Sequence, residues 1–279
     1  MTHVRATPLE IAQEVLQSPC CQSSLQWRID RQTHSLPEEA TLTCLACSHP
    51  YLLAQGILDF LGSDHGTEVI TPFQRLMQFP PIARVYEKWW RPIGFFIASS
   101  SSFHKFSTQI VGLVGQHAGR CLLDLACGPG LLTTPLAERT EGVVFGLDLS
   151  MPMLRQARRR LHSRQIRNVL LVRGSAFRLP FRDETFSGIL CSGALHLFDQ
   201  PTLALAEISR TLARPAALVC QTTLRPKHSA GLASFLESII RFGFFSSPEE
   251  IQRLLKSEGL TVTHDWRRRI IYLFEAKRL

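Results

Sequence analysis

Residues 121–130, which read CLLDLACGPG, decide the fold of this chain. The first five are mostly apolar, and a short apolar run of this kind is typical of a central strand in a parallel sheet. Gly128 and Gly130 follow, and glycine lets the backbone bend sharply and a ligand approach the main chain. The stretch therefore predicts a buried strand, a tight turn and the start of a helix, which is where α/β folds bind cofactors.

From residue 109 onward the chain alternates predicted strands and helices. This alternation predicts a parallel, doubly wound sheet. Two final strands flank three consecutive arginines and predict an antiparallel pair at the sheet edge. The strands are expected at residues 121–125, 143–147, 169–172, 186–191, 216–222, 260–266 and 270–276. The helices are expected at residues 108–117, 131–140, 150–164, 201–212, 232–242 and 247–256.

Composition divides the chain into three predicted parts. The first contains two cysteine clusters near predicted hairpin turns, the second is an aromatic-rich helical connector, and the third is the α/β core with an apolar insertion beside the expected substrate pocket. The aromatic residues of the connector, among them Phe103 and Phe106, either form a lid over an apolar substrate or pack helices against the core. The boundaries are expected at residues 1–62, 63–108 and 109–279, with the insertion at 224–245.

Four cysteines in the first part have the pattern of a zinc ribbon, in which four thiolates close a tetrahedral site between two turns. The second pair has the Cys-x-x-Cys spacing of such a turn. The first pair is adjacent, and Ser18 stands where the first cysteine of that spacing would be. The site therefore uses Cys20 as a displaced ligand, borrows His49, or holds no metal and is stabilised by packing alone. The predicted ligands are Cys20, Cys21, Cys44 and Cys47.

The chain of 279 residues has a formal net charge of +8, and the excess is uneven. Residues 151–182 contain nine arginines and no acidic residue. Nucleic acid or an anionic membrane surface would bind such a cluster, and a solvated helix face is the alternative interpretation. No apolar run reaches the roughly 18–20 residues that a membrane span needs, so we expect a cytoplasmic protein with at most peripheral membrane contact.

The residues around the glycine turn narrow the expected ligand. Thr133 stands where the dinucleotide-binding pattern has its third glycine, and the turn lacks the lysine of a triphosphate-binding loop. Asp124 precedes the turn at the strand end, where it can accept from an ammonium group or orient the turn. Asp148 ends the next strand, where a carboxylate can accept both ribose hydroxyls of an adenosine. These features favour a ligand that contains adenosine and is not bound through a triphosphate.

Four motifs resemble, in order and spacing, those of the class I S-adenosylmethionine-dependent methyltransferases, most closely the branch of ubiquinone and menaquinone biosynthesis. They are residues 123–130, 147–150, 174–181 and 194–196. The resemblance covers residues 109–279 and implies S-adenosylmethionine as cofactor. It also implies a Rossmann-like, doubly wound sheet of seven strands with a reversed C-terminal strand pair. The cysteine unit and the YEKWWRP segment at residues 86–92 resemble plant and cyanobacterial methyltransferase-like proteins, and the cysteine unit is similar to that of zinc-bearing ribosomal RNA guanine methyltransferases.

The resemblance implies which residues bind the cofactor. Gly128 and Gly130 would flank its methionine moiety, and Asp148 would hold the ribose. The chain departs from the family at Ser175, where an aspartate usually binds the adenine amino group, and one lost hydrogen bond weakens binding by about 0.5–1.5 kcal/mol. The implied cofactor-binding residues are Asp124, Ala126, Cys127, Gly128, Gly130, Asp148, Leu149, Met153, Ser175, Ala176, Phe177 and Ser192.

Transfer of a methyl group from a sulfonium mainly requires alignment of the acceptor and exclusion of water, and a base only when the acceptor is a hydroxyl, a phenol or an acidic carbon. His196 is the candidate base, with a structural role as the alternative; His104 and His228 are further candidates. The predicted function is methyl transfer to a small, hydrophobic acceptor such as a quinone or phenol. The alternatives are an RNA base methyltransferase and a non-catalytic binding protein of the same fold. The sequence does not predict an oligomeric state.

Overall fold

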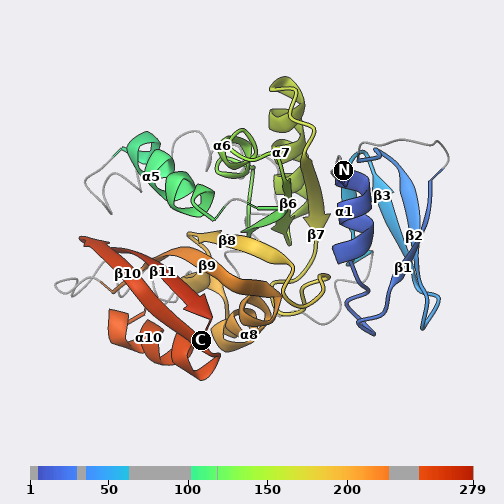
Figure 1. Cartoon of the computed structure of the whole chain (residues 1–279). Coiled ribbons are helices and arrows are strands. Elements are labelled where there is room, and N and C mark those ends of the chain that lie inside the picture. Colours follow the sequence, from blue (N-terminus) through green and yellow to red (C-terminus); the bar gives the residue numbers. More distant parts are fainter. Residues whose placement is uncertain (1–5, 30–35, 63–101, 118, 226–244, 279) are drawn as a thin grey trace, which may run out of the picture.

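The computed structural model describes residues 6–29, 36–62, 102–117, 119–225 and 245–278. Within these residues one mixed sheet has helices on both faces (Figure 1), which confirms the predicted α/β architecture. Most of the predicted connector, most of the apolar insertion and His228 lie outside the described residues. No helix in the described ranges is long and apolar enough to cross a membrane.

Eleven strands form the sheet, in the order β1-β2-β3-β4-β7-β6-β5-β8-β9-β11-β10. The five strands from β7 to β9 are parallel to their neighbours, whereas β11 pairs antiparallel with both β9 and β10. The reversed C-terminal pair is therefore present as predicted. The strands are β1 Leu25–Arg28, β2 Ala40–Cys44, β3 Pro50–Ala54, β4 Ile57–Asp59, β5 Cys121–Leu125, β6 Val143–Asp148, β7 Val169–Arg173, β8 Phe186–Ser192, β9 Leu212–Thr223, β10 Leu260–Arg268 and β11 Ile271–Arg278.

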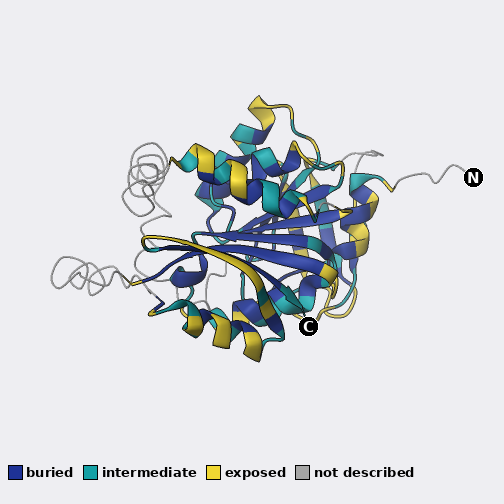
Figure 2. Ribbon diagram, turned by 60° about the vertical axis from the view of Figure 1, so that its left-hand side comes forward, coloured by how far each residue is buried: buried dark blue, intermediate teal, exposed yellow. Residues whose placement is uncertain are grey.

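Helices cover the two faces of the sheet in separate groups. The apolar residues of α5 and α6 pack with Leu122 and Val144, while those of α8 and α10 pack with the next residues along the strands, Leu123 and Phe145. Successive strand residues point to opposite faces, so this alternation buries the central strands on both sides. Figure 2 shows these strands as the most buried part of the molecule. The helices are α1 Pro8–Val15, α5 Phe103–Gly115, α6 Thr133–Ala137, α7 Met151–Ser163, α8 Pro201–Thr211 and α10 Pro248–Ser257, with a short 3-10 helix, η2, at Leu195–Leu197.

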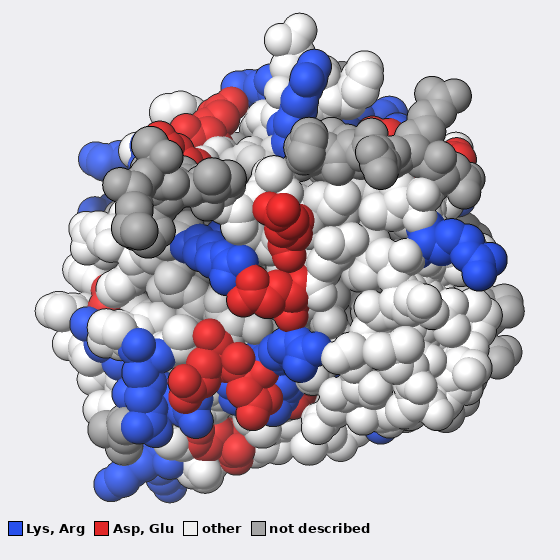
Figure 3. Space-filling view, turned by 45° about the vertical axis from the view of Figure 1, so that its right-hand side comes forward, with Lys and Arg blue, Asp and Glu red and all other residues white. Residues whose placement is uncertain are grey.

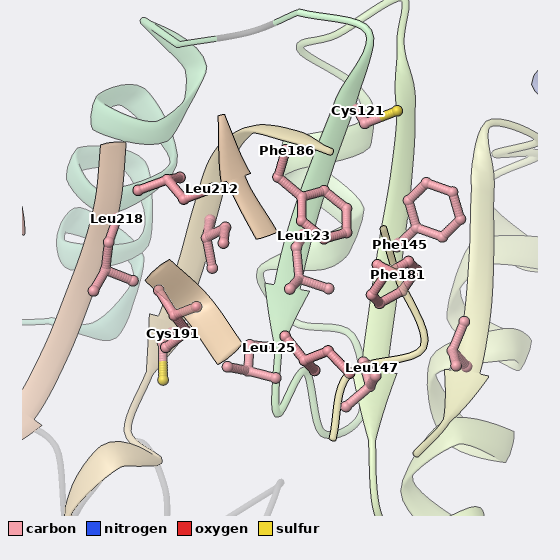
Figure 4. Packing of buried hydrophobic residues seen from close by; sticks show 14 of the residues in the cluster. Cys121, Leu123, Leu125, Phe145, Leu147, Phe181, Phe186, Cys191, Leu212 and Leu218 are labelled. Carbon is pink, nitrogen blue, oxygen red and sulfur yellow. The ribbon is translucent and has the colours of Figure 1, made fainter. Parts of the chain in front are cut away.

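Three phenylalanines form the centre of the largest core cluster (Figure 4). The ring centroids of Phe145 and Phe181 are 5.1 Å apart, and those of Phe181 and Phe186 are 4.8 Å apart, both in edge-to-face orientation. Such aromatic pairs contribute about 0.5–1.5 kcal/mol beyond the area they bury. Phe145 comes from β6 and Phe186 from β8, so the cluster spans β5 between them and holds the strands that carry the glycine turn.

The four N-terminal strands extend the core sheet. β4 lies parallel to β7, with Ile57 opposite Leu171 and Asp59 opposite Arg173. The cysteine-containing unit, which the sequence predicts as a separate small part, is therefore continuous with the core through backbone pairing. The predicted seven strands correspond to β5–β11, and four more strands add to them.

The first core helix begins earlier than predicted, and its start changes the interpretation of two aromatic residues. Ser102 caps α5, because its side chain accepts a hydrogen bond from the Lys105 N–H at 3.3 Å. Phe106 is buried in α5 and packs against the core, and Phe103 packs beside it. Of the two predicted roles, packing of helices against the core therefore applies to Phe103 and Phe106, because the helical turn directs them onto the sheet. Helix α6 is shorter than the predicted 131–140, since residues 131 and 132 remain in the turn.

An ion pair joins the N-terminal strands to the core. Arg173 donates from Nη1 to Asp59 Oδ2 at 2.9 Å and to the Gly62 carbonyl at 3.1 Å. Its Nε donates to the carbonyl of Leu149 at 3.4 Å. The Arg173 side chain is 10% exposed and that of Asp59 is 21% exposed, so water competes weakly with these contacts. Arg173 therefore connects the end of β4 to the loop that follows β6.

We expect Arg173→Ala to lower the free energy of unfolding by about 2–3 kcal/mol, because the substitution leaves the partly buried Asp59 carboxylate without its guanidinium partner. Urea unfolding of the full chain measures this change. Arg158→Ala is the control, because Arg158 pairs with Glu38 at the surface. Its loss should cost no more than about 1 kcal/mol. Equal costs for the two substitutions would contradict a special role of Arg173.

Candidate cofactor and catalytic site

The glycine turn lies between β5 and α6 and has a strained backbone. Ala126, Gly128 and Gly130 have φ angles of +56°, +55° and +75°. A Cβ atom added to Gly130 would lie 3.0 Å from the Cβ of Ala157, so the turn packs directly against α7. A Cβ atom added to Gly128 would meet no heavy atom within 4 Å of the described structure. Gly128 therefore borders open space, as a turn that receives a ligand requires.

Asp148, at the end of β6, holds the glycine turn in place. Its Oδ2 accepts a hydrogen bond from the Gly128 N–H and its Oδ1 one from the Ser150 N–H, both at 2.8 Å. Burial raises the pKa of this carboxyl above its usual value, and the backbone donors oppose the shift. Each oxygen of an ionised carboxylate can accept a second hydrogen bond. Asp148 can therefore bind hydroxyl groups of a ligand while it keeps its two backbone bonds.

One buried polar group near the turn lacks a hydrogen-bond partner in the described structure. The Ser150 hydroxyl is buried, and no atom of the described structure forms a hydrogen bond with it. A buried hydroxyl without a partner costs about 1–3 kcal/mol. This orphan lies two residues beyond Asp148, where a polar ligand would supply the missing bond.

Asp124 lies at the base of the turn on β5 and is 2% exposed. Its Oδ2 accepts a hydrogen bond from Thr133 Oγ1 at 2.5 Å. Thr133 therefore has a defined role at the position where the dinucleotide-binding pattern has its third glycine. The hydrogen bond links the end of β5 to the first residue of α6 and orients the carboxylate that precedes the turn.

The thiol of Cys127 is buried, and its Sγ donates to the Gly128 carbonyl at 3.7 Å. It packs with Leu154 and Ala157 of α7 and with Leu171 of β7 in a buried apolar cluster. Burial raises the pKa of this thiol well above its usual value, so the group is neutral. A contact of Cys127 with a cofactor would therefore come from the main chain, whose N–H donates to the Leu147 carbonyl.

The loop after β7 contains the residues expected at the adenine. Ser175 is buried, and its Oγ accepts from the Phe177 N–H at 3.1 Å, so the hydroxyl closes its own turn. The ring of Phe177 meets that of Phe198 edge to face, with centroids 5.7 Å apart. Met153 is buried on α7, and Leu149 is held by its carbonyl through Arg173. The strands are parallel, so these loops follow carboxyl ends at one edge of the sheet.

The ends of β8 and β9 carry a buried polar network at the same edge. Ser192 Oγ donates to Gln221 Oε1 at 3.1 Å. His196 is 6% exposed, and its Nδ1 lies 3.2 Å from Thr222 Oγ1. Burial lowers the pKa of His196 to about 4, so its imidazole is neutral at physiological pH. A neutral histidine can accept a proton, which is the property required of the predicted base.

The structure brings all four predicted metal ligands together. The Sγ atoms of Cys20, Cys21, Cys44 and Cys47 lie within 4.8 Å of one another. The Cys20 Sγ is 3.1 Å from that of Cys21 and 3.3 Å from that of Cys47. The alternative ligand, His49, instead packs its ring on Tyr51 at a centroid distance of 4.9 Å. The cluster lies in the turns before β1 and between β2 and β3.

The arginine-rich segment is largely occupied by internal contacts. Arg158 and Arg164 form ion pairs with Glu38 and Glu138. Further members of the group that contact described residues are Arg160 with the Pro129 carbonyl, Arg173 with Asp59, and Arg182 with the Glu14 carbonyl and Ser24. On the face drawn in Figure 3, basic and acidic side chains alternate and leave a broad uncharged area. Five of the nine arginines therefore have structural partners, which weakens their interpretation as a phosphate-binding patch.

Sequence reasoning missed several residues of this site. The sequence pattern shows at Thr133 only that the third glycine of the dinucleotide-binding pattern is missing. Gln221 and Thr222 lie in an apolar run that predicts only a strand. Arg173 appeared as one of many arginines, and its contact with Asp59 spans 114 positions. No local pattern carries a partner so distant in the sequence.

Comparison with known proteins identifies the family. A family described as "Methyltransferase domain" matches residues 122–215. An uncharacterized chloroplastic methyltransferase of Arabidopsis thaliana is 27% identical, over 88% of this chain and 74% of the relative. A demethylmenaquinone methyltransferase of Lactiplantibacillus plantarum is 41% identical, over 47% of this chain and 56% of the relative.

Solved structures agree on the fold. A Haemonchus contortus phosphoethanolamine N-methyltransferase, crystallised with phosphomonomethylethanolamine and S-adenosylhomocysteine, superposes with a TM-score of 0.60 at 15% identity. The match covers 74% of this chain and 59% of that one. The strand order, the glycine turn with Asp148, and the sequence relatives lead to one conclusion. The chain is a class I S-adenosylmethionine-dependent methyltransferase, of the branch that includes the enzymes of quinone biosynthesis.

Proposed function

We propose that this methyltransferase acts on a small, hydrophobic acceptor with an acidic hydroxyl or carbon, such as a hydroquinone or phenol. The observation that carries the proposal is the buried, neutral His196 at the same sheet edge as the glycine turn. Relatives named demethylmenaquinone methyltransferase support an aromatic, quinone-type acceptor. The relatives that carry this name share about half of this chain, so the acceptor stays a proposal.

The residues at the glycine turn fit S-adenosylmethionine. We propose that the spare acceptor positions of Asp148 bind the ribose hydroxyls and that the open face of Gly128 receives the methionine moiety. The unpartnered Ser150 hydroxyl supplies a further polar contact. When bound, this cofactor supplies a methyl group on a positively charged sulfur. The proposed contact residues are Asp124, Ala126, Cys127 through its main chain, Gly128, Gly130, Asp148, Leu149, Met153, Ser175, Ala176, Phe177 and Ser192.

The protein's own contribution to the reaction is a base and a dry environment. If the Nδ1–H of His196 donates to Thr222 Oγ1, Nε2 carries the lone pair that accepts a proton from the acceptor. A pKa of about 4 makes His196 a weak base. It therefore suits an acceptor whose proton leaves as the methyl group arrives, and an acceptor that is acidic before the reaction. Thr222 would act as a positioning residue.

The RNA alternative has less support. An RNA base methyltransferase needs cationic side chains that are available to phosphates and aromatic side chains that stack on bases. Five of the nine arginines in residues 151–182 contact other parts of the described chain.

The proposed acceptor class is tested by transfer of a labelled methyl group from S-adenosylmethionine. We expect label in a reduced demethylated naphthoquinone or a substituted phenol, and none in RNA at moderate salt. Label in RNA that disappears as salt concentration rises, with none in the small acceptors, would contradict the proposal. Label in neither would favour a binding protein of the same fold.

Asp148→Asn should weaken S-adenosylmethionine binding by about 10- to 100-fold, because the charge that strengthens its hydrogen bonds to the ribose is lost. The amide oxygen still accepts one backbone bond, so the turn is expected to remain folded. Calorimetric titration measures the affinity, and thermal unfolding checks the fold. Glu138→Gln is the matched control, since its carboxylate pairs with Arg164 at the surface and should leave the affinity unchanged. An unchanged affinity in Asp148→Asn would exclude Asp148 as the ribose ligand.

His196→Asn should lower kcat by about 100-fold with little change in S-adenosylmethionine affinity, since a general base contributes about 10²–10⁴. In the wild type the imidazole stays neutral down to a pH near 4, so kcat should not fall between pH 8 and pH 5 through this group. A stopped assay over that range measures the profile. Thr222→Val should show a smaller loss of kcat. An unchanged kcat in His196→Asn would assign His196 to structure. A wild-type rate that falls with a midpoint at the ordinary histidine pKa of about 6.5 would contradict the lowered pKa of the buried imidazole.

A further inference from the structure

We propose that Cys20, Cys21, Cys44 and Cys47 bind one zinc ion as four thiolates, with Cys20 replacing a ligand that the turn itself has lost. This site lies outside the methyl-transfer machinery and does not depend on the proposed acceptor. The four Sγ atoms already converge within 4.8 Å. They come from two turns that are distant in the sequence.

The two turns have the same backbone geometry. The Ser48 N–H donates to the Cys44 carbonyl at 2.9 Å, and Ser48 has a φ angle of +60°. In the other turn, the Gln22 N–H donates to the Ser18 carbonyl at 2.9 Å, and Gln22 has a φ angle of +53°. Each turn therefore spans five residues, closes with one bond and ends in a left-handed residue. Two facing turns with the same backbone conformation are the arrangement of a zinc ribbon.

This equivalence identifies the altered position. Cys47 corresponds to Cys21, and Cys44 corresponds to Ser18, which is a hydroxyl where the symmetric site would have a thiolate. Cys20 lies between the two equivalent positions of its turn, and its Sγ reaches 3.3 Å from that of Cys47. The fourth thiolate therefore comes from a residue two positions later in the chain.

Ser18 still contributes to the site through a hydrogen bond. It is fully buried, and its Oγ lies 3.0 Å from Cys20 Sγ and 2.8 Å from the Tyr51 hydroxyl. A hydroxyl at this distance can donate to a thiolate, and such outer contacts orient ligands and tune metal affinity. The Tyr51 hydroxyl is also 3.5 Å from Cys20 Sγ. Ser18, which stands at the position of the missing ligand, thus supports Cys20, which replaces that ligand.

The donor set selects the metal. Four sulfur ligands favour a soft or borderline ion, and a tetrahedral arrangement of thiolates is typical of zinc. With a Zn–S distance of about 2.3 Å, tetrahedral geometry places the sulfur atoms about 3.8 Å apart. The shortest separations of 3.1 and 3.3 Å need to widen by less than an ångström. A disulfide would need about 2.05 Å. All four cysteines are free thiols, and each one releases a proton to solvent when the ion binds.

The zinc ion would cross-link the N-terminal part of the chain. The ion connects the turn after α1 to the turn between β2 and β3. In the described sheet, strands β1, β2 and β3 are paired to the core strands through the three-residue β4. A metal cross-link would add to the stability that Leu42 and Tyr51 gain from burial in the core cluster.

The metal content of the purified full chain, measured after reduction and with zinc supplied, tests the proposal. We expect one zinc per chain. Cobalt titration should give the absorption of a tetrahedral thiolate site. Cys20→Ser and Cys21→Ser should each lower zinc affinity by more than about 100-fold, and Ser18→Ala by about 10-fold. Cys121→Ala, which removes a buried thiol outside the cluster, should change nothing in metal binding.

A rescue variant separates loss of a ligand from loss of folding. Ser18→Cys combined with Cys20→Ser restores the symmetric spacing and should bind zinc at least as tightly as the wild type. Absence of zinc from wild-type protein would overturn the proposal, and so would a cobalt spectrum without thiolate character. Full zinc affinity in Cys20→Ser would also overturn it, because Ser18 or His49 would then complete the site.

Discussion

Two backbone N–H groups donate to the two oxygens of one carboxylate, and the cofactor edge depends on this arrangement. Asp148 ends β6, Gly128 lies in the turn after β5, and Ser150 precedes α7. The turn contains left-handed residues, and a left-handed residue other than glycine, such as Ala126, costs roughly 1–2 kcal/mol. Packing of Gly130 against Ala157 and the bonds to Asp148 offset that cost. One side chain therefore fixes a turn, the end of a strand and the start of a helix.

The core could be predicted because its strands are buried on both faces. Such strands read as continuous apolar runs, and the expected bounds of 121–125 agree with β5. Pairing of β4 with β7 could not be predicted, because the three residues Ile57–Asp59 carry no signal of register. The sequence left the role of Phe106 open for a related reason. Its spacing indicates a helix but does not say whether the buried face meets the sheet or a substrate.

The candidate site likewise contains some residues that the sequence predicts and others that it does not. Asp124 and Asp148 lie next to the turn, as their positions at strand ends predict, because parallel strands finish at one edge. Thr133 and the pair of Ser192 with Gln221 depend on side-chain contacts between elements, which spacing does not encode. The cysteines are an intermediate case. Their spacing predicted two turns, whereas the equivalence of Ser18 and Cys44 follows from backbone angles that only the structure contains.

The serine at position 175 changes which residues of the proposed site would recognise the cofactor. Ser175 has a hydroxyl where the resemblance to the family implies a carboxylate, and this hydroxyl already accepts a hydrogen bond from the Phe177 N–H. It therefore cannot offer a charged acceptor, and adenine would be held mainly by the apolar surfaces of Met153 and Phe177. Asp148 then remains as the carboxylate at the turn that can form charge-assisted bonds to the ligand. The buried Asp124 accepts a hydrogen bond from Thr133 at the base of the turn. Recognition of the adenosine should consequently depend more on the ribose than on the base.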